Sequence, residues 1–484
     1  MDISNVEHRI SNVEVLFGQP RLLRRISSDG SPSPLRRRGR GMRSLVKISY
    51  RRLICLIWAT SVVFLLIGCS EKKDTPASSS SSIELTYWPA PNQQEVQLAD
   101  SLVKRWNRLH PDIQVRMQPI PVSQSTEEVL LAAIAGKTTP DVCSNIWPGA
   151  LHEYTQAGGI IPLDQFSDFD SIASSRIPRE LLRTFQGTDG HFYQFPWKTN
   201  PVMMFYNKRL LREAGVYQVP RTYSEFLAAG KKVSRDTNGD GQIDVWMGER
   251  DIRPIWWQRL FDFFPFYIAA SNGKTLFENG NVAFGNKAAE DVLTFFQECY
   301  SQRLFPRTFF QGGDPFFLEK KATHFSGPWQ VAAVQKFAPN IDYGVAPLPV
   351  PDDHQGPVYT SGDYKNIAIF GNTKHPREAW EFVKFLVTAE HDMMLLELCN
   401  QIPVRRDLLT NPLFADYFKR NPVMVSFAEQ AVYTRSMDTA PDLKEIFDGI
   451  SQEYEMCAVY GKKAPAEAVQ DAARRAQLIV EWNK

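Results

Sequence analysis

The sequence predicts an α/β fold in which a mostly parallel sheet is wrapped by helices. Residues 83–87, 113–117 and 141–145 are short segments with the apolar pattern of buried or half-buried strands. Between them lie two segments whose apolar residues recur every three or four positions, which is the period of a helix. The predicted order is therefore strand, helix, strand, helix, strand, which is typical of parallel pairing.

Each of the two predicted helices begins with a capping signal. Asn92 is followed three residues later by Glu95, and Ser125 is followed at the same spacing by Glu128. Gly136 is predicted to end the second helix.

Two tryptophans come directly after predicted strands. Ligands of parallel α/β sheets bind beyond the carboxyl ends of the strands, so Trp88 and Trp147 are predicted at the rim of a ligand cleft. Packing of either ring in the core is the alternative.

The composition indicates a globular protein with sizeable cores and room for two or three domains, because 43% of its 484 residues are hydrophobic and 12% aromatic. Residues 1–68 hold 12 Lys and Arg against 4 Asp and Glu. The rest of the chain, residues 69–484, therefore has 43 basic and 50 acidic residues, a net charge of −7. Such a balance implies no basic face for nucleic acid.

The segment 42–68 is predicted to be a signal peptide, with four basic residues ahead of an apolar run. The run ends in Leu66-Ile67-Gly68-Cys69, which resembles the lipobox cut by signal peptidase II. Cys69 would then carry diacylglycerol and anchor the chain to a bacterial membrane, facing the periplasm or the exterior. The alternative is a transmembrane anchor, but the apolar run of about 16 residues is shorter than the roughly 20 that a bilayer requires.

Residues 1–41 fit neither a leader nor a core, so Met42 is the preferred start of translation. The Ser-rich segment 69–82 is predicted to be a flexible tether.

Four cysteines follow the leader without any C-x-x-C spacing, so no zinc or redox motif is present. Buried free thiols are favoured over one or two disulfides, since most of these cysteines lie among apolar residues at helical spacing. The four are Cys143, Cys299, Cys399 and Cys457.

Residues 83–484 resemble the family 1 extracellular solute-binding proteins, the group that includes maltose-binding protein. The order of several segments carries the resemblance, rather than one motif. These segments are LTYW (85–88), AGKTTPDVCSN (135–145), YTQAGGIIPLDQF (154–166), the stretch 190–215 containing Tyr206-Asn207-Lys208, FLEKKATHFSGPWQ (317–330), YGVAPLPVP (343–351), 361–387 and QIPVRRDLL (401–409).

The resemblance implies a two-lobed, periplasmic-binding-protein-like fold of type II, with the solute held between lobes that close over it. It implies a monomer without cofactor that delivers a sugar or oligosaccharide to the transmembrane subunits of an ABC transporter. The expected N-lobe is 83–198 with 365–415, and the expected C-lobe is 202–360 with 430–484. Hinge crossovers are expected near 198–202, 362–365 and 412–432.

A sugar site needs aromatic planes for its C–H faces and polar groups for its hydroxyls. The chain has 11 Trp. The resemblance makes Trp329, in Gly327-Pro328-Trp329, the first candidate, because the corresponding Trp stacks on sugar in the family. It also places Trp256 and Trp257 near the aromatic of the C-lobe and Trp147 near that of the N-lobe.

The two expected hinges contribute further candidates, because the family often contacts ligand there through polar groups. Tyr193, Trp197 and Asn200 lie at the first hinge, and Asp363 and Tyr364 lie at the second.

One acidic loop resembles the calcium loop of an EF-hand, with Gly241 at its sixth position. Met247 stands at position twelve, where a bidentate Glu would supply the strongest ligand. The loop could therefore hold a structural calcium or form a tight turn without metal, and the sequence leaves both interpretations. The candidate ligands are Asp236, Asn238, Asp240, Gln242 and Asp244.

Two other functions remain alternatives. A lipid-anchored glycosidase would need a pair of carboxylates roughly 5–10 Å apart, and the sequence contains no G-x-S-x-G, H-E-x-x-H or P-loop motif of other enzymes. A binding protein for a polyamine would need several carboxylates, and one for a glycerol phosphate diester would need Arg side chains or helix N-termini.

Overall fold

The computed structural model describes residues 82–482 except 123–124, 279, 439 and 441. These residues belong to one compact unit. The predicted leader, the lipidated Cys69 and nearly all of the tether lie outside the described residues, so those predictions are not tested by the structure.

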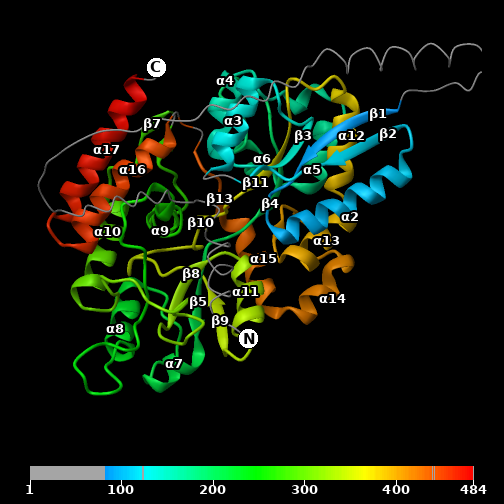
Figure 1. Ribbon diagram of the computed structural model, residues 1–484. Coiled ribbons are helices and arrows are strands. Elements are labelled where there is room, and N and C mark those ends of the chain that lie inside the picture. Colours follow the sequence, from blue (N-terminus) through cyan, green and yellow to red (C-terminus); the bar gives the residue numbers. More distant parts are fainter. Residues whose placement is uncertain (1–81, 123–124, 279, 439, 441, 483–484) are drawn as a thin grey trace, which may run out of the picture. The chain divides into compact units, whose positions relative to one another are not determined.

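A six-stranded sheet forms the centre of the first lobe, with the strand order β12-β4-β11-β3-β1-β2 (Figure 1). Its strands are β1 Ile83–Trp88, β2 Ile113–Met117, β3 Val142–Ile146, β4 Phe195–Thr199, β11 Lys365–Ile369 and β12 Ile402–Pro403.

The predicted parallel pairing holds for two of the five strand pairs of this sheet. β1 pairs in parallel with β2 and with β3, as the strand–helix–strand order predicts. β11 pairs antiparallel with β3 and β4, and β12 pairs antiparallel with β4. The prediction of a mostly parallel sheet is therefore wrong, because segments that return from far along the chain complete a mixed sheet.

The first two helices have the predicted caps. The Asn92 side chain accepts a hydrogen bond from the backbone N–H of Glu95, and the Ser125 side chain accepts one from Glu128. The second helix continues through Gly136, and Lys137 takes the left-handed conformation with φ 54°. The helices of this lobe are α2 Gln93–Leu109, α3 Thr126–Gly136, α4 Leu151–Gln156, α5 Phe169–Arg176, α6 Arg179–Arg183, α12 Pro376–Leu386 and α13 Ala389–Cys399.

The second lobe is built on an antiparallel sheet of order β8-β5-β9 and on a large aromatic core. Its strands are β5 Met203–Asn207, β8 Thr323–Ser326 and β9 Tyr343–Ala346, with a separate hairpin of β6 Phe277–Glu278 and β7 Asn281–Val282. Its helices are α7 Lys208–Glu213, α8 Tyr223–Val233, α9 Phe263–Ala270, α10 Lys287–Ser301, α11 Trp329–Phe337, α16 Leu443–Tyr454 and α17 Pro465–Trp482.

Two short strands run side by side where the chain passes between the sheets. β10 Thr360–Ser361 pairs in parallel with β13 Thr434–Arg435. Helices α14 Pro412–Arg420 and α15 Pro422–Gln430 precede β13, and their apolar residues share a core with β5 and α11. The segments 360–365 and 431–438 therefore lie together between the two sheets.

All four cysteines of the described residues are buried free thiols, which confirms the preferred interpretation. Burial raises the pKa of the Cys143 thiol to about 12, so it stays protonated at neutral pH.

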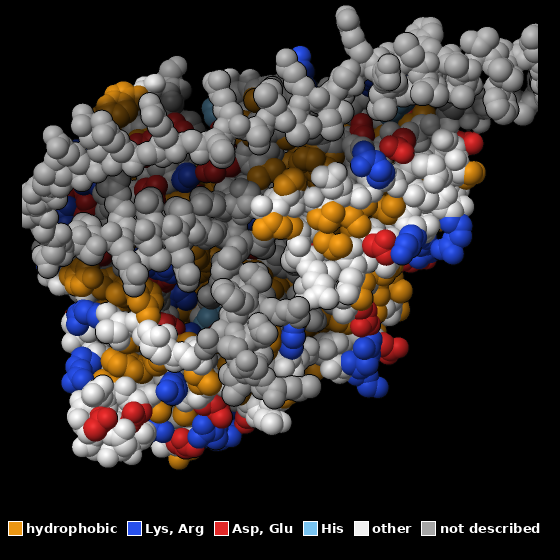
Figure 2. Space-filling view, in the orientation of Figure 1, with side chains coloured by type: hydrophobic (Ala, Val, Ile, Leu, Met, Phe, Trp, Pro, Cys, Tyr) orange, Lys and Arg blue, Asp and Glu red, His pale blue; other side chains and the backbone are white. Residues whose placement is uncertain are grey.

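Charged side chains of both signs alternate on the described part of the face shown in Figure 2. Exposed ion pairs among the described residues include Arg209 with Glu213 and Lys208 with Asp342. Within residues 82–482 as described, none of the helices is both long enough and apolar enough to cross a bilayer.

Candidate ligand-binding cleft

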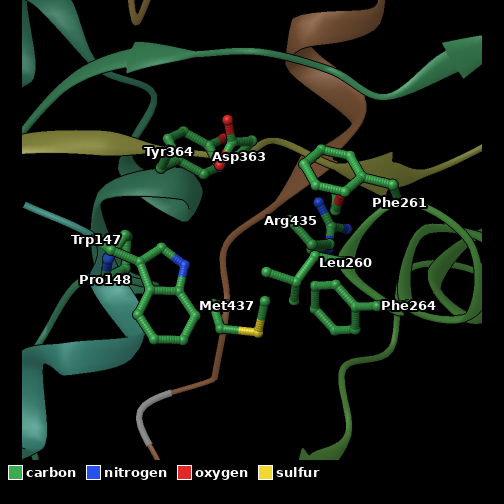
Figure 3. A pocket seen from close by; sticks show the side chains of 10 residues that line it. Trp147, Pro148, Leu260, Phe261, Phe264, Asp363, Tyr364, Arg435 and Met437 are labelled. Atoms are coloured by element: carbon green, nitrogen blue, oxygen red, sulfur yellow. The ribbon is translucent and has the colours of Figure 1, made fainter. Parts of the chain in front are cut away.

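A pocket lies where the two lobes and the paired segments meet (Figure 3). Its wall combines aromatic and aliphatic side chains with a carboxylate, a guanidinium and a hydroxyl. The lining residues are Trp147, Pro148, Leu260, Phe261, Phe264, Ser361, Asp363, Tyr364, Arg435 and Met437.

Trp147 supplies the aromatic wall on the N-lobe side. It directly follows β3, and its ring folds back over Gly149 so closely that a Cβ at position 149 would overlap the indole. Across the cleft it meets Trp256 of the C-lobe, with ring centroids 6.2 Å apart. Glycine at position 149 therefore permits the ring position that brings Trp147 to the cleft.

The C-lobe wall comes from the end of the 3-10 helix η4 Trp256–Leu260 and the start of α9. Phe261 lines the pocket and packs edge-to-face against Trp329, with ring centroids 6.0 Å apart. The half-buried Trp329 begins α11, and its ring lies over Gly327, where a Cβ would overlap it. The Gly-Pro-Trp segment thus supports the pocket wall through Phe261.

Asp363 contributes the carboxylate. Its φ of 35° is uncommon for a residue other than glycine, and such backbone strain concentrates at ligand sites. Its Oδ1 lies 3.4 Å from Lys365 Nζ. Burial opposes the charge of Lys365, but Asp363, Glu127 and Glu95 outweigh it, and the pKa of Lys365 is raised. Lys365 is therefore charged at neutral pH.

Tyr364 lies between the pocket and the N-lobe core. Its ring packs edge-to-face on Phe185 at 4.9 Å, and its hydroxyl is hydrogen-bonded to Thr434 of β13. Burial raises the pKa of Tyr364 to about 12. The residue therefore joins the N-lobe to the crossover segment as well as lining the pocket.

Arg435 contributes the guanidinium, which is already held by the protein. Its Nε donates to the Gly273 carbonyl at 3.0 Å and its Nη1 to the Thr434 carbonyl at 3.1 Å. The guanidinium carbon lies 4.0 Å from the ring centroid of Tyr359, a cation–π contact. These contacts fix the side chain in the pocket wall.

Three of the ten predicted ligand residues line this pocket: Trp147, Asp363 and Tyr364. Two more, Trp256 and Trp329, contact the ring of a lining residue.

The other predicted residues lie elsewhere. Trp88 and Tyr193 are half-buried beside the same core cluster as Trp147, and the Tyr193 hydroxyl donates to Asp189 at 2.6 Å. Trp257 is half-buried in η4. Trp197 and Asn200 are each 2% exposed, so neither side chain faces open solvent at the hinge.

Sequence reasoning missed most of the C-lobe wall and the crossover residues. Leu260, Phe261 and Phe264 belong to a dense apolar run that looks like core, and only the fold distinguishes the positions facing the cleft. Arg435 and Met437 lie just past the predicted crossover, in a segment with no local pattern.

In the loop predicted to bind calcium, the carboxylates accept hydrogen bonds from backbone N–H groups of the same loop. Asp236 accepts from the N–H groups of Gly239 and Gly241, both at 2.7 Å, and Asp244 accepts from Thr237. Across the described residues, no group of three or more His, Cys, Asp or Glu side chains is placed to hold a metal ion. A structural calcium remains a prediction.

The family model for bacterial extracellular solute-binding proteins matches residues 90–393, more than half of the chain. This chain belongs to that family. The members of this family are described as extracellular solute-binding proteins of bacteria.

Named relatives extend over most of the chain. The maltotriose-binding protein of Pyrococcus abyssi is 25% identical over 405 residues, covering 82% of each chain. The arabinooligosaccharide-binding protein of Halalkalibacterium halodurans is 23% identical over 353 residues, covering 69% of this chain and 74% of its own length.

Solved structures confirm the two-lobed fold. An uncharacterized protein from Listeria monocytogenes superposes with a TM-score of 0.73 at 28% identity, covering 82% of this chain and all of its own. The cyclic α-maltosyl-1,6-maltose binding protein of Arthrobacter globiformis gives a TM-score of 0.71 at 18% identity, covering 83% and 99%. The predicted fold class is correct, while the exact lobe boundaries remain predictions.

Proposed function

We propose that this solute-binding protein captures a sugar or oligosaccharide and delivers it to the transmembrane subunits of an ABC transporter. The observation that carries the proposal is the composition of the pocket. The rings of Trp147, Phe261 and Tyr364 offer surfaces for the C–H faces of a sugar, and Asp363 and Arg435 offer groups for its hydroxyls. The names of relatives that bind maltotriose and arabinooligosaccharides support the same class.

The pocket disfavours the two charged solutes. A polyamine would need several carboxylates, whereas Asp363 is the only carboxylate among the described residues that line the pocket, and Arg435 repels a cation. A phosphate diester would use Arg435, but two of its nitrogens already donate to backbone carbonyls. A neutral, hydroxyl-rich solute needs neither extra carboxylates nor a free guanidinium.

The pocket also disfavours a glycosidase. Hydrolysis of a glycosidic bond uses two carboxyl groups on opposite sides of the scissile bond. The described residues of the pocket wall include a single carboxylate, which favours binding without cleavage, in keeping with a family of binding proteins.

Saccharides are expected to raise the melting temperature of the protein, because a ligand that binds only the folded state stabilises it. Maltotriose and arabinotriose would be compared with spermidine and glycerophosphocholine in thermal melting of the full chain. Small-angle scattering with the stabilising solute should show a smaller radius of gyration as the lobes close. Stabilisation by spermidine or glycerophosphocholine alone would overturn the sugar assignment.

We further propose that Cys69 carries the lipid that anchors the protein to a membrane. We also propose that the protein acts as a monomer. The support is the sequence, namely the basic segment, the short apolar run and Leu66-Ile67-Gly68 before the cysteine.

Cells labelled with a radioactive fatty acid should incorporate label into the wild-type protein and not into the Cys69→Ala variant. Cys55→Ala, which alters another leader cysteine, is the matched control and should retain the label. Equal labelling of wild type and Cys69→Ala would refute lipidation at this residue.

A further inference from the structure

A second cavity of about 370 Å3 lies behind the segment 434–438. This volume is at the lower end of the roughly 300–1,000 Å3 typical of small-molecule sites. Thr184, at the end of α6, lines it on the N-lobe side, and residues of the β6–β7 hairpin line it on the C-lobe side. The cavity therefore touches both lobes, as the cleft does.

Two residues form a common wall between this cavity and the cleft. Arg435 and Met437 line both, and the other lining residues of the two pockets differ. The hydrogen bond from Arg435 to the carbonyl of Gly273 holds the guanidinium in this wall. The second cavity is therefore a separate site that adjoins the cleft.

A buried hydroxyl in the lining lacks a partner. Ser436 is 4% exposed, and among the described residues nothing forms a hydrogen bond with its Oγ. An unsatisfied buried hydroxyl costs about 1–3 kcal/mol. A serine side chain can take any of three staggered rotamers, so its hydroxyl can turn toward a bound molecule.

A second polar group, the half-buried Asp438, lies in the same lining. Its carboxylate accepts from the N–H of Leu276 at 2.9 Å, and burial raises the pKa of Asp438 to about 6. At neutral pH it is mostly ionised, so a ligand hydroxyl that donates to it would be stabilising.

The rest of the lining matches a sugar rather than an ion. Lys274 and Arg435 are cationic while Glu278 and Asp438 are anionic, so neither sign of charge is favoured. Thr184, Thr275 and Ser436 supply hydroxyls, and Phe277 supplies a ring. Groups of this kind suit a ligand whose hydroxyls both donate and accept and whose ring has apolar faces.

We infer that this cavity is a second saccharide-binding site, separated from the cleft by Arg435 and Met437. Because its occupant would touch both lobes, binding there is linked to binding in the cleft. The choice of a saccharide as the ligand rests on the proposed function. The site itself does not depend on which sugar the cleft binds.

Thr184→Trp tests the inference, because an indole at this exposed position would occupy the cavity, and Thr184 itself lines only the cavity and not the cleft. Arg183→Trp, one residue earlier and also exposed, is the matched control. The full chain would be titrated with maltotriose and with arabinotriose in a calorimeter. Wild type and Arg183→Trp should show two saturable events, and Thr184→Trp should show only the cleft event.

Two further variants separate this inference from the proposed function. Ser436→Ala should weaken the second event about fivefold, as expected for one hydrogen bond. Trp329→Ala should remove the cleft event and leave the second. A single event in wild type that Trp329→Ala abolishes would overturn the second site and leave the proposed function standing. Absence of any saccharide binding would overturn both.

Discussion

The Trp329→Ala variant is expected to bind solute at least about thirtyfold more weakly than wild type while remaining folded. The indole is half-buried at the start of α11, and it meets the pocket residue Phe261 edge-to-face. Loss of a desolvated aromatic in a binding site typically costs upward of ~2 kcal/mol, or about thirtyfold in affinity. The ring lies over Gly327, where a Cβ would overlap it, and its contact with Phe261 supports the pocket wall.

Calorimetric titration and thermal melting of the same sample separate a binding role from a packing role. Trp380→Ala is the matched control, since Trp380 is 2% exposed in the N-lobe core and its Nε1 donates to Asp168 at 2.7 Å. That control should lose roughly 3–5 kcal/mol of stability. If Trp329→Ala melts as early as Trp380→Ala and its folded fraction binds normally, Trp329 is a core residue.

Local signals predicted the start of the fold, because helix caps and strand alternation depend on neighbouring residues. The caps at Asn92 and Ser125 are present as expected, and so are the strands predicted at 83–87 and 113–117. The mixed sheet could not be predicted in this way. β11 pairs with β3 across more than 200 residues, and nothing in its own pattern specifies its direction or its partner.

The residues of the candidate site also fall into those that local sequence could predict and those that it could not. Trp147 directly follows a strand, and Asp363 and Tyr364 lie in the segment expected to cross between lobes, so their positions could be argued from the chain. Trp197 was expected at a hinge, yet every residue of β4 is buried, and alternation cannot identify an exposed face on such a strand. Arg435 and Phe261 reach the pocket only through tertiary contacts between distant segments.

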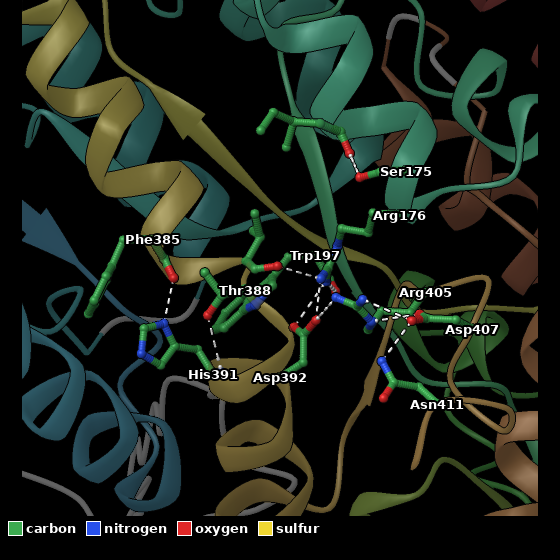
Figure 4. Close-up of polar contacts among 12 residues, drawn as sticks. Ser175, Arg176, Trp197, Phe385, Thr388, His391, Asp392, Arg405, Asp407 and Asn411 are labelled. Atoms are coloured by element: carbon green, nitrogen blue, oxygen red, sulfur yellow. Dashed lines mark hydrogen bonds and ion pairs between the residues drawn. The ribbon is translucent and has the colours of Figure 1, made fainter. Parts of the chain in front are cut away.

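A network of buried charged side chains contacts β4, the strand that leads into the first expected hinge (Figure 4). Asp392 of α13 is fully buried and pairs with Arg176 of α5, with Arg176 Nη2 at 3.0 Å from Oδ1. Arg405 donates to the other oxygen of Asp392 at 3.0 Å. Arg176 also donates to the carbonyl of Trp197 in β4 at 3.0 Å and to that of Val387 at 2.8 Å. The Asp392 carboxylate therefore pairs with the guanidiniums of Arg176 and Arg405, and Arg176 in turn links α5 and α13 to β4.

Asp392→Ala is expected to destabilise the protein by about 3–5 kcal/mol, because it leaves two largely buried guanidiniums without their shared counter-charge. Asp100→Ala, which removes an exposed ion pair with Lys104, is the control and should change stability by less than about 1 kcal/mol. Urea unfolding followed by circular dichroism measures both. An Asp392→Ala midpoint close to that of Asp100→Ala would mean that water replaces the carboxylate and that the network does not brace β4.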